Sequence, residues 1–129
     1  MVKGLKIAMI VYGAIGIFLG LGLVFFPGKL LSASGLENVP GYVLWFESII
    51  GVATLVPSFF YILAARDPLK HIMWVQFAIV WSFLDLLANL FFVIRGMITF
   101  KMAGSVIIID IIFMVILLIL YPWRKAPFS

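Results

Sequence analysis

The sequence contains no cysteine and a single histidine, His71. The absence of thiols excludes disulfides, thiolate catalysis, iron–sulfur clusters and cysteine-ligated metals. A lone histidine argues against haem or metal ligation built on imidazoles. Charge is also scarce, because only 11% of the residues are Asp, Glu, Lys or Arg. We therefore expect no metal site and no covalently bound cofactor.

Apolar residues dominate what is present, at 66% of the 129 residues. A helix that crosses the ~30 Å hydrocarbon core of a bilayer needs roughly 20 apolar residues. Four such stretches occupy nearly the whole chain, at about 5–26, 42–65, 72–94 and 102–121. This pattern predicts an all-α integral membrane protein, an antiparallel up-down-up-down four-helix bundle that forms one transmembrane domain over residues 1–129.

Prolines mark the ends of three of these stretches, at Pro27, Pro68 and Pro122. Proline has no N–H to donate and disfavours helix in the residue before it. The connector 27–41 is accordingly predicted to be the longest loop. The first stretch follows two lysines, as a secretory signal would, but a signal core is typically about 7 to 15 residues long. We expect this longer stretch to be a retained membrane helix.

Basic residues are distributed unequally between the two ends of the predicted bundle. With four crossings, both termini lie on one side of the membrane, and basic residues favour the cytoplasmic side. That side would carry six basic residues, namely Lys3, Lys6, Arg66, Lys70, Arg124 and Lys125, against Lys29, Arg95 and Lys101 on the other. We expect both termini to be cytoplasmic, and the net charge of +4 to serve contact with lipid headgroups rather than nucleic acid.

Small residues predict how the helices pack, because helices in lipid associate through close backbone contact and interhelical hydrogen bonds. The first stretch carries Gly13, Gly16 and Gly20 along one side. The second carries a stripe of residues spaced by four and three positions: Glu47, Gly51, Thr54, Ser58 and Tyr61. We expect these two seams to face each other.

Three acidic residues fall inside the predicted helices, where an Asp at the bilayer centre costs about 2.5 to 3.5 kcal/mol. At about 1.5 Å per residue, Glu47 lies about 8 Å from the outer end of its helix, Asp110 about 12 Å and Asp85 about 15 Å. The two aspartates are thus expected at similar depth on neighbouring antiparallel helices. Three ionised carboxylates in so low a dielectric would be prohibitive, so we expect at least one to be protonated.

These acids predict an outward-opening polar cavity that carries protons or holds the polar head of a ligand. Its hypothesised lining is Glu47, Asp85, Asn89 and Asp110, with Trp81 beside them and Arg95 at the mouth. Arg95 is the nearby cation long enough to reach inward. The alternative is purely structural: each acid is neutral, bonds to Ser82, Asn89, Thr54 or a backbone carbonyl, and only joins helices.

The order of these features is similar to that of a known group. The glycine-rich end of the first helix runs into Lys29-Leu30, the stretch Glu47-Ser48-Ile49-Ile50-Gly51 opens the second helix, and a short basic hairpin precedes the third. In these respects the chain resembles the DoxX-like family of four-helix membrane proteins. The resemblance implies a prokaryotic cytoplasmic-membrane protein, often an accessory subunit of a quinone-dependent or redox-protective complex. Only Glu47 and Gly51 match a recurrent pattern of that family.

Three functions remain open. The first is a ligand-binding or accessory subunit whose cavity receives a quinone or lipid-like molecule, in a homodimer or a larger membrane complex. The second is a proton-coupled small-molecule transporter that uses Asp85 and Asp110, although four-helix multidrug exporters carry their glutamate in the first helix, where this chain has Tyr12 and glycines. The third is an intramembrane isomerase whose carboxylates move protons on a lipid. Catalysis by the chain on its own is the less favoured interpretation.

Overall fold

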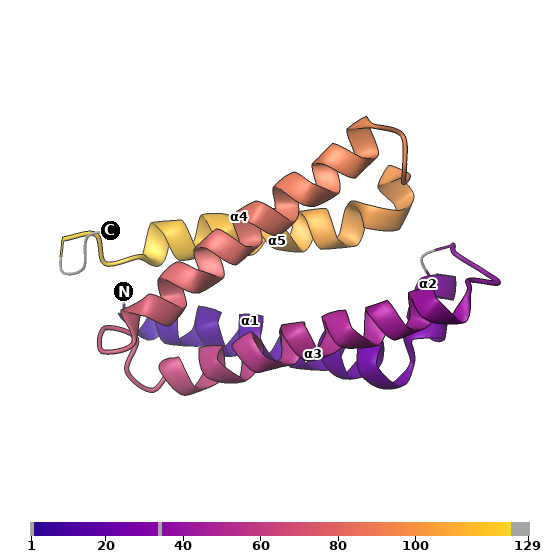
Figure 1. Ribbon diagram of the computed structural model, residues 1–129. Coiled ribbons are helices and arrows are strands. Elements are labelled where there is room, and N and C mark those ends of the chain that lie inside the picture. The colour runs from indigo at the N-terminus through magenta and orange to yellow at the C-terminus, as the bar shows by residue number, and fades with distance from the viewer. Residues whose placement is uncertain (1, 34, 125–129) are drawn as a thin grey trace.

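The computed structural model describes residues 2–33 and 35–124. Within these ranges the chain forms no strand and five helices: α1 (Val2–Phe25), α2 (Pro27–Ala33), α3 (Gly41–Ala64), α4 (Ile72–Ile94) and α5 (Phe100–Leu120) (Figure 1). The predicted all-α class is confirmed, and the four predicted membrane helices correspond to α1, α3, α4 and α5. Lys125, one of the basic residues assigned to the termini, lies outside the described residues.

The four long helices contain 21 to 24 residues each and are apolar enough to cross a membrane. Large apolar side chains cover their outer surfaces: Phe18 is 78% exposed and Ile94 82%. In water such a surface would drive association, whereas lipid tails are as apolar as the side chains themselves. Length, composition and surface therefore agree on a small integral membrane protein built as a helical bundle.

The prediction of a loop over 27–41 is wrong in part, because Pro27–Ala33 form α2. Proline ends α1, but its fixed φ also suits the first turn of a new helix, where its missing N–H is not needed. Leu30 of α2 packs against Gly22 near the end of α1. Gly35 follows α2 with a φ of +94°, the left-handed conformation that commonly ends a helix.

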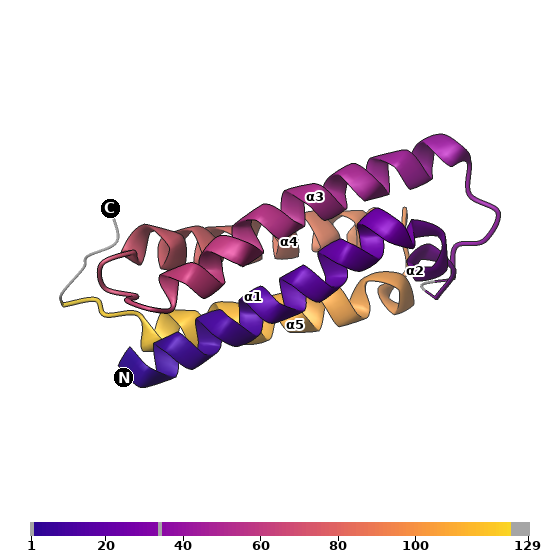
Figure 2. The same ribbon diagram turned by 90° about the horizontal axis from the view of Figure 1, so that it is seen from below.

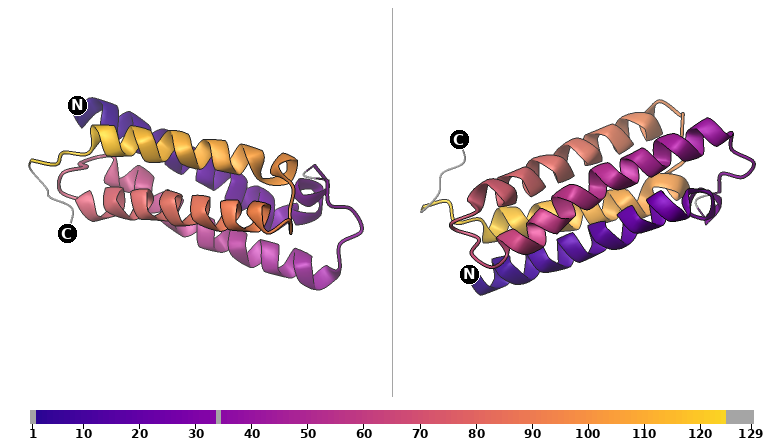
Figure 3. Two further views of the ribbon diagram at one scale, coloured as in Figure 1. Left: turned by 90° about the horizontal axis from the view of Figure 1, so that it is seen from above. Right: turned by 60° about the horizontal axis from the view of Figure 1, so that its bottom comes forward.

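The long helices are arranged as two pairs. Each runs antiparallel to the next, so the start of α1 and the end of α5 lie at the same end of the molecule (Figure 1). One pair is α1 with α3, and the other is α4 with α5. Figures 2 and 3 show the pairs stacked, with α1 over α5 and α3 over α4.

Glycines allow α1 and α3 to approach closely, as the two seams predict. A Cβ added at Gly51 would lie 2.8 Å from the carbonyl oxygen of Gly20, and one at Gly13 would lie 2.7 Å from that of Ser58. A methyl group at Gly16 would collide with the Ser58 side chain. The backbones are therefore in contact along most of the pair, and the prediction that these seams face each other is confirmed.

The buried core lies at the end that holds the start of α1. All four long helices contribute to it, and its largest members include Leu5, Met9, Tyr12, Tyr61, Val75, Phe113, Leu117 and Tyr121. A second cluster of Leu86, Ala103 and Ile107 lies between α4 and α5 alone. The two pairs are thus joined at one end, and they separate toward the end that holds α2 (Figure 1).

Candidate functional site

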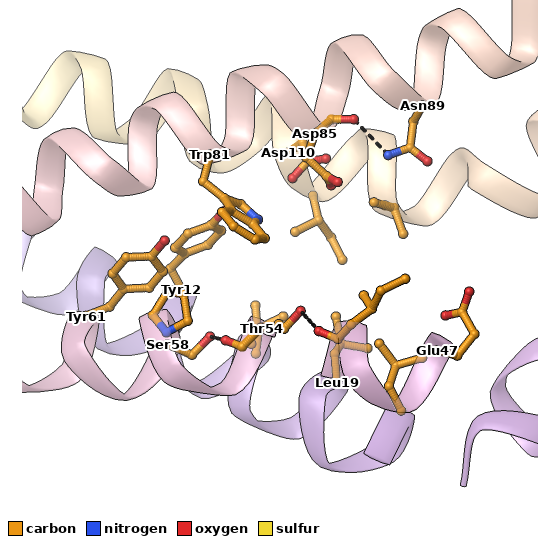
Figure 4. A pocket seen from close by; sticks show the side chains of 17 residues that line it. Tyr12, Leu19, Glu47, Thr54, Ser58, Tyr61, Trp81, Asp85, Asn89 and Asp110 are labelled. Atoms are coloured by element: carbon orange, nitrogen blue, oxygen red, sulfur yellow. Dashed lines mark hydrogen bonds between the residues drawn. The ribbon is translucent and has the colours of Figure 1, made fainter. Parts of the chain in front are cut away.

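A cavity of about 360 Å³ lies between the two helix pairs, beside the core and toward the end that holds α2. All four long helices line it. Its walls include the apolar side chains of Ile15, Leu19, Leu23, Ile50, Val106 and Ile109. Its polar lining includes Tyr12, Glu47, Thr54, Ser58, Tyr61, Asp85, Asn89 and Asp110, with Trp81 at one side (Figure 4). The cavity therefore combines an apolar surface with acidic and hydroxyl groups.

Asp85 of α4 and Asp110 of α5 meet at the wall formed by their helix pair (Figure 4). Their carboxyl groups lie close enough to interact electrostatically, and Asp110 is only 4% exposed. Two carboxylates so close together repel each other in a low dielectric, and a proton on either one removes that repulsion. The pair is thus a place that can hold a proton at membrane depth.

In the structural alternative, Ser82, Asn89 and Thr54 would form hydrogen bonds to the acids, but in the structure these side chains have other partners. Asn89 Nδ2 donates to the backbone carbonyl of Asp85 at 2.8 Å, and Thr54 Oγ1 donates to the carbonyl of Ile50 at 2.9 Å. Ser82 Oγ lies 2.7 Å from the hydroxyl of Tyr12. None of these bonds reaches a carboxyl group, so the acids are not simply absorbed into side-chain bridges between helices.

Two buried polar atoms at the cavity have no hydrogen-bond partner among the described residues. They are Oδ2 of Asp110 and the hydroxyl of Tyr61. Tyr61 is 3% exposed, and its ring stacks on that of Tyr12 with the centroids 5.3 Å apart. Buried polar groups normally find a partner, so each exception needs an explanation.

The sequence hypothesis omits Tyr12 and Tyr61, which form the closed end of the cavity. One feature of the sequence could have indicated Tyr61, which lies in the same helical stripe as Glu47. Glu47 is half-buried and lies toward the open end, while Trp81 is partly exposed and stacks on Phe77 at 5.9 Å (Figure 4). Glu47, Trp81, Asp85, Asn89 and Asp110 are thus brought together around one cavity.

Arg95 is the predicted site residue that the structure places elsewhere. Its side chain is exposed, with the guanidinium 5.6 Å from the ring centroid of Phe91, and it does not line the cavity. The physical reason is helical geometry: ten residues at about 100° each turn Arg95 about 80° away from the face that carries Asp85. As a result, no cationic side chain is among the described residues that line the cavity.

Within the described part of the chain, no group of three or more His, Cys, Asp or Glu side chains is placed to hold a metal ion. Comparison with protein-family models, with curated proteins and with solved structures finds no match to this chain. The chemistry of the cavity is therefore what indicates a function.

Proposed function

We propose that this membrane protein binds, within the bilayer, a small molecule with an apolar body and a polar head, and that it acts as a ligand-binding or accessory subunit of a membrane complex. A quinone or a lipid-like molecule has this form. The observation that carries the proposal is the pair of unpartnered buried atoms, Tyr61 OH and Asp110 Oδ2. A ligand's polar head would supply the hydrogen bonds that these atoms lack.

The shape and lining of the cavity support the same proposal. Pockets for small molecules are concave and mostly apolar, with a few polar groups that fix orientation. Here the polar groups include Asp110 and the two tyrosines, while Leu19, Leu23 and other aliphatic residues form much of the wall. A flat ring in the bound molecule would stack on the side chain of Trp81, which lies at one side of the cavity. The resemblance to the DoxX-like family supports the accessory role, and with it a prokaryotic cytoplasmic membrane.

The experiment is to block the cavity and identify what purifies with the protein. Val106 lines the cavity, and Val106→Trp would fill it. Ile108, on the same helix, is 51% exposed and does not line the cavity, so Ile108→Trp is the matched control. We expect mass spectrometry of extracts from detergent-purified protein to show a molecule retained by the wild type and by Ile108→Trp and lost from Val106→Trp. Equal recovery from all three would overturn the proposal.

A second candidate function is proton-coupled transport, which the contact between Asp85 and Asp110 favours. Two interacting carboxyl groups titrate as a pair, so a charged solute that approaches one of them changes the proton occupancy of both. The discriminating measurement is solute flux into proteoliposomes under an imposed pH gradient. Flux that needs both aspartates would favour transport, whereas ligand retention without flux would favour the binding or accessory role.

A further inference from the structure

The charges at the cavity are all of one sign. Glu47, Asp85 and Asp110 line it, and no Lys, Arg or His is among the described residues that do. Arg95, the expected counter-charge, lies against Phe91 instead. Even one proton on the pair of aspartates would leave two of the three acids without a counter-charge. Buried charges in proteins are normally paired, because burial of an unpaired charge is costly.

The two unpartnered atoms define what the missing partner must offer. Asp110 Oδ2 is an acceptor when its carboxyl is ionised, and Tyr61 OH both donates and accepts. The rings of Tyr12, Tyr61 and Trp81 lie beside them (Figure 4). Aromatic faces attract cations, and a charge-assisted N–H···O bond is about twice as strong as a neutral one. A cationic hydrogen-bond donor matches all of these groups.

We propose that the ligand's head group is a protonated amine, so that the cavity takes an amphiphilic amine. The ammonium donates to Asp110 Oδ2 and brings one positive charge to a cavity lined by three acids. The apolar part lies along Leu19 and Ile50 toward the open end. This inference rests on the proposed function and narrows its ligand class from any lipid-like molecule or quinone to one that carries a positive N–H donor.

The experiment compares three probes of the same skeleton on the full chain in detergent micelles, by isothermal titration calorimetry near pH 7. The probes are 4-phenylbutylamine, the neutral 4-phenylbutanol, and trimethyl(4-phenylbutyl)ammonium, which has the charge but no N–H. We expect the amine to bind about tenfold or more tightly than either of the others, since it alone offers both charge and a hydrogen bond.

The variant that identifies the acceptor is Asp110→Asn. It should weaken the binding of the amine to the level of the alcohol and leave the alcohol unchanged. Probe partition into micelles is common to all variants, so the difference between them reports the cavity. Asp85 is half-buried, and Asp85→Asn is the second variant, to be used if Asp110→Asn does not fold. It should weaken the binding of the amine and leave the binding of the alcohol unchanged.

The outcomes separate this inference from the function on which it rests. If the alcohol and the amine bind equally, and Val106→Trp abolishes the binding of both, the proposed amine head group is overturned and the ligand-binding function stands. If amine and trimethylammonium bind equally, or if the amine binds both Asp→Asn variants as it binds the wild type, the amine head group is also overturned. If no probe binds and Val106→Trp retains every co-purified molecule, the proposed function fails as well.

Discussion

The hydroxyl of Tyr12 on α1 lies 2.7 Å from Oγ of Ser82 on α4, and this bond joins the two helix pairs at the closed end of the cavity. The same ring packs on Tyr61 of α3 and on Phe113 of α5, with centroids 5.3 and 4.8 Å away. One side chain thus contacts the other three long helices. Tyr12 therefore fixes the distance between the pairs where the cavity begins.

Tyr12→Phe should lower stability by about 1 kcal/mol, because it removes one interhelical hydrogen bond and leaves the Ser82 hydroxyl buried without its partner. The measurement is thermal unfolding of the purified protein in detergent. Tyr42→Phe is the matched control, since Tyr42 is 66% exposed at the start of α3. An equal response of the two variants would contradict a joining role for Tyr12.

Gly51→Ala should be the more damaging of two matched glycine substitutions in α3. Its new methyl group would lie 2.8 Å from the backbone oxygen of Gly20 and 2.9 Å from Leu23 Cβ, atoms that cannot move without separating α1 from α3. We expect a loss of about 1 to 3 kcal/mol, as for other overpacked sites. Gly41→Ala meets nothing within 4 Å and should leave the unfolding temperature nearly unchanged. Equal unfolding temperatures would show that the seam does not hold the pair.

The spans and the glycine seam were predictable from the sequence because both depend on local spacing. A stretch of apolar residues sets the length of a helix whatever its neighbours are. Gly13, Gly16 and Gly20 recur at helical intervals, so their shared face follows from the geometry of a single helix. The similar depth of Asp85 and Asp110 follows by the same counting. Each of these inferences needs only the rise and turn of a helix.

The remaining features depend on how the helices are rotated and tilted, which spacing does not fix. The unpartnered hydroxyl of Tyr61 depends on how α3 is rotated against the other helices, whereas its place near the end of a membrane helix indicates only an interfacial aromatic residue. Arg95 seemed able to reach the acids by length, but its turn about the helix axis takes it to Phe91. The sequence pattern did not predict α2, because Pro27 both ends one helix and suits the first position of the next.

Arg95→Gln should leave ligand binding unchanged, because the side chain is exposed over Phe91 and does not line the cavity. The measurement is the affinity for 4-phenylbutylamine by calorimetry. Asp85→Asn, on the same helix, provides the contrast and should weaken that affinity. A loss of affinity in Arg95→Gln comparable to that of Asp85→Asn would show that Arg95 lies at the mouth of the site after all.

The orientation of the bundle can be tested by labelling, because the chain has no cysteine of its own. Glu37, in the connector after α2, and Lys70, in the connector between α3 and α4, are both exposed and lie at opposite ends of α3. With both termini cytoplasmic, a membrane-impermeant maleimide should label Glu37→Cys in intact cells and label Lys70→Cys only after lysis. The reverse pattern would invert the topology and make the cavity open toward the cytoplasm.

Asp110→Asn should separate stability from binding. In the wild type, an acid that is 4% exposed holds one oxygen without a partner, an arrangement that burial alone does not favour. The amide has no charge to bury, so we expect the variant to be as stable as the wild type or more stable, by up to about 2 kcal/mol. Its unfolding temperature in detergent should therefore stay the same or rise. Retention of the co-purified ligand should fall in the same preparation. Such opposite signs are typical of groups kept for function at the expense of stability. A loss of stability as large as that of Tyr12→Phe would instead identify Asp110 as a joint between α4 and α5, because the carboxyl contact with Asp85 would then hold the pair together.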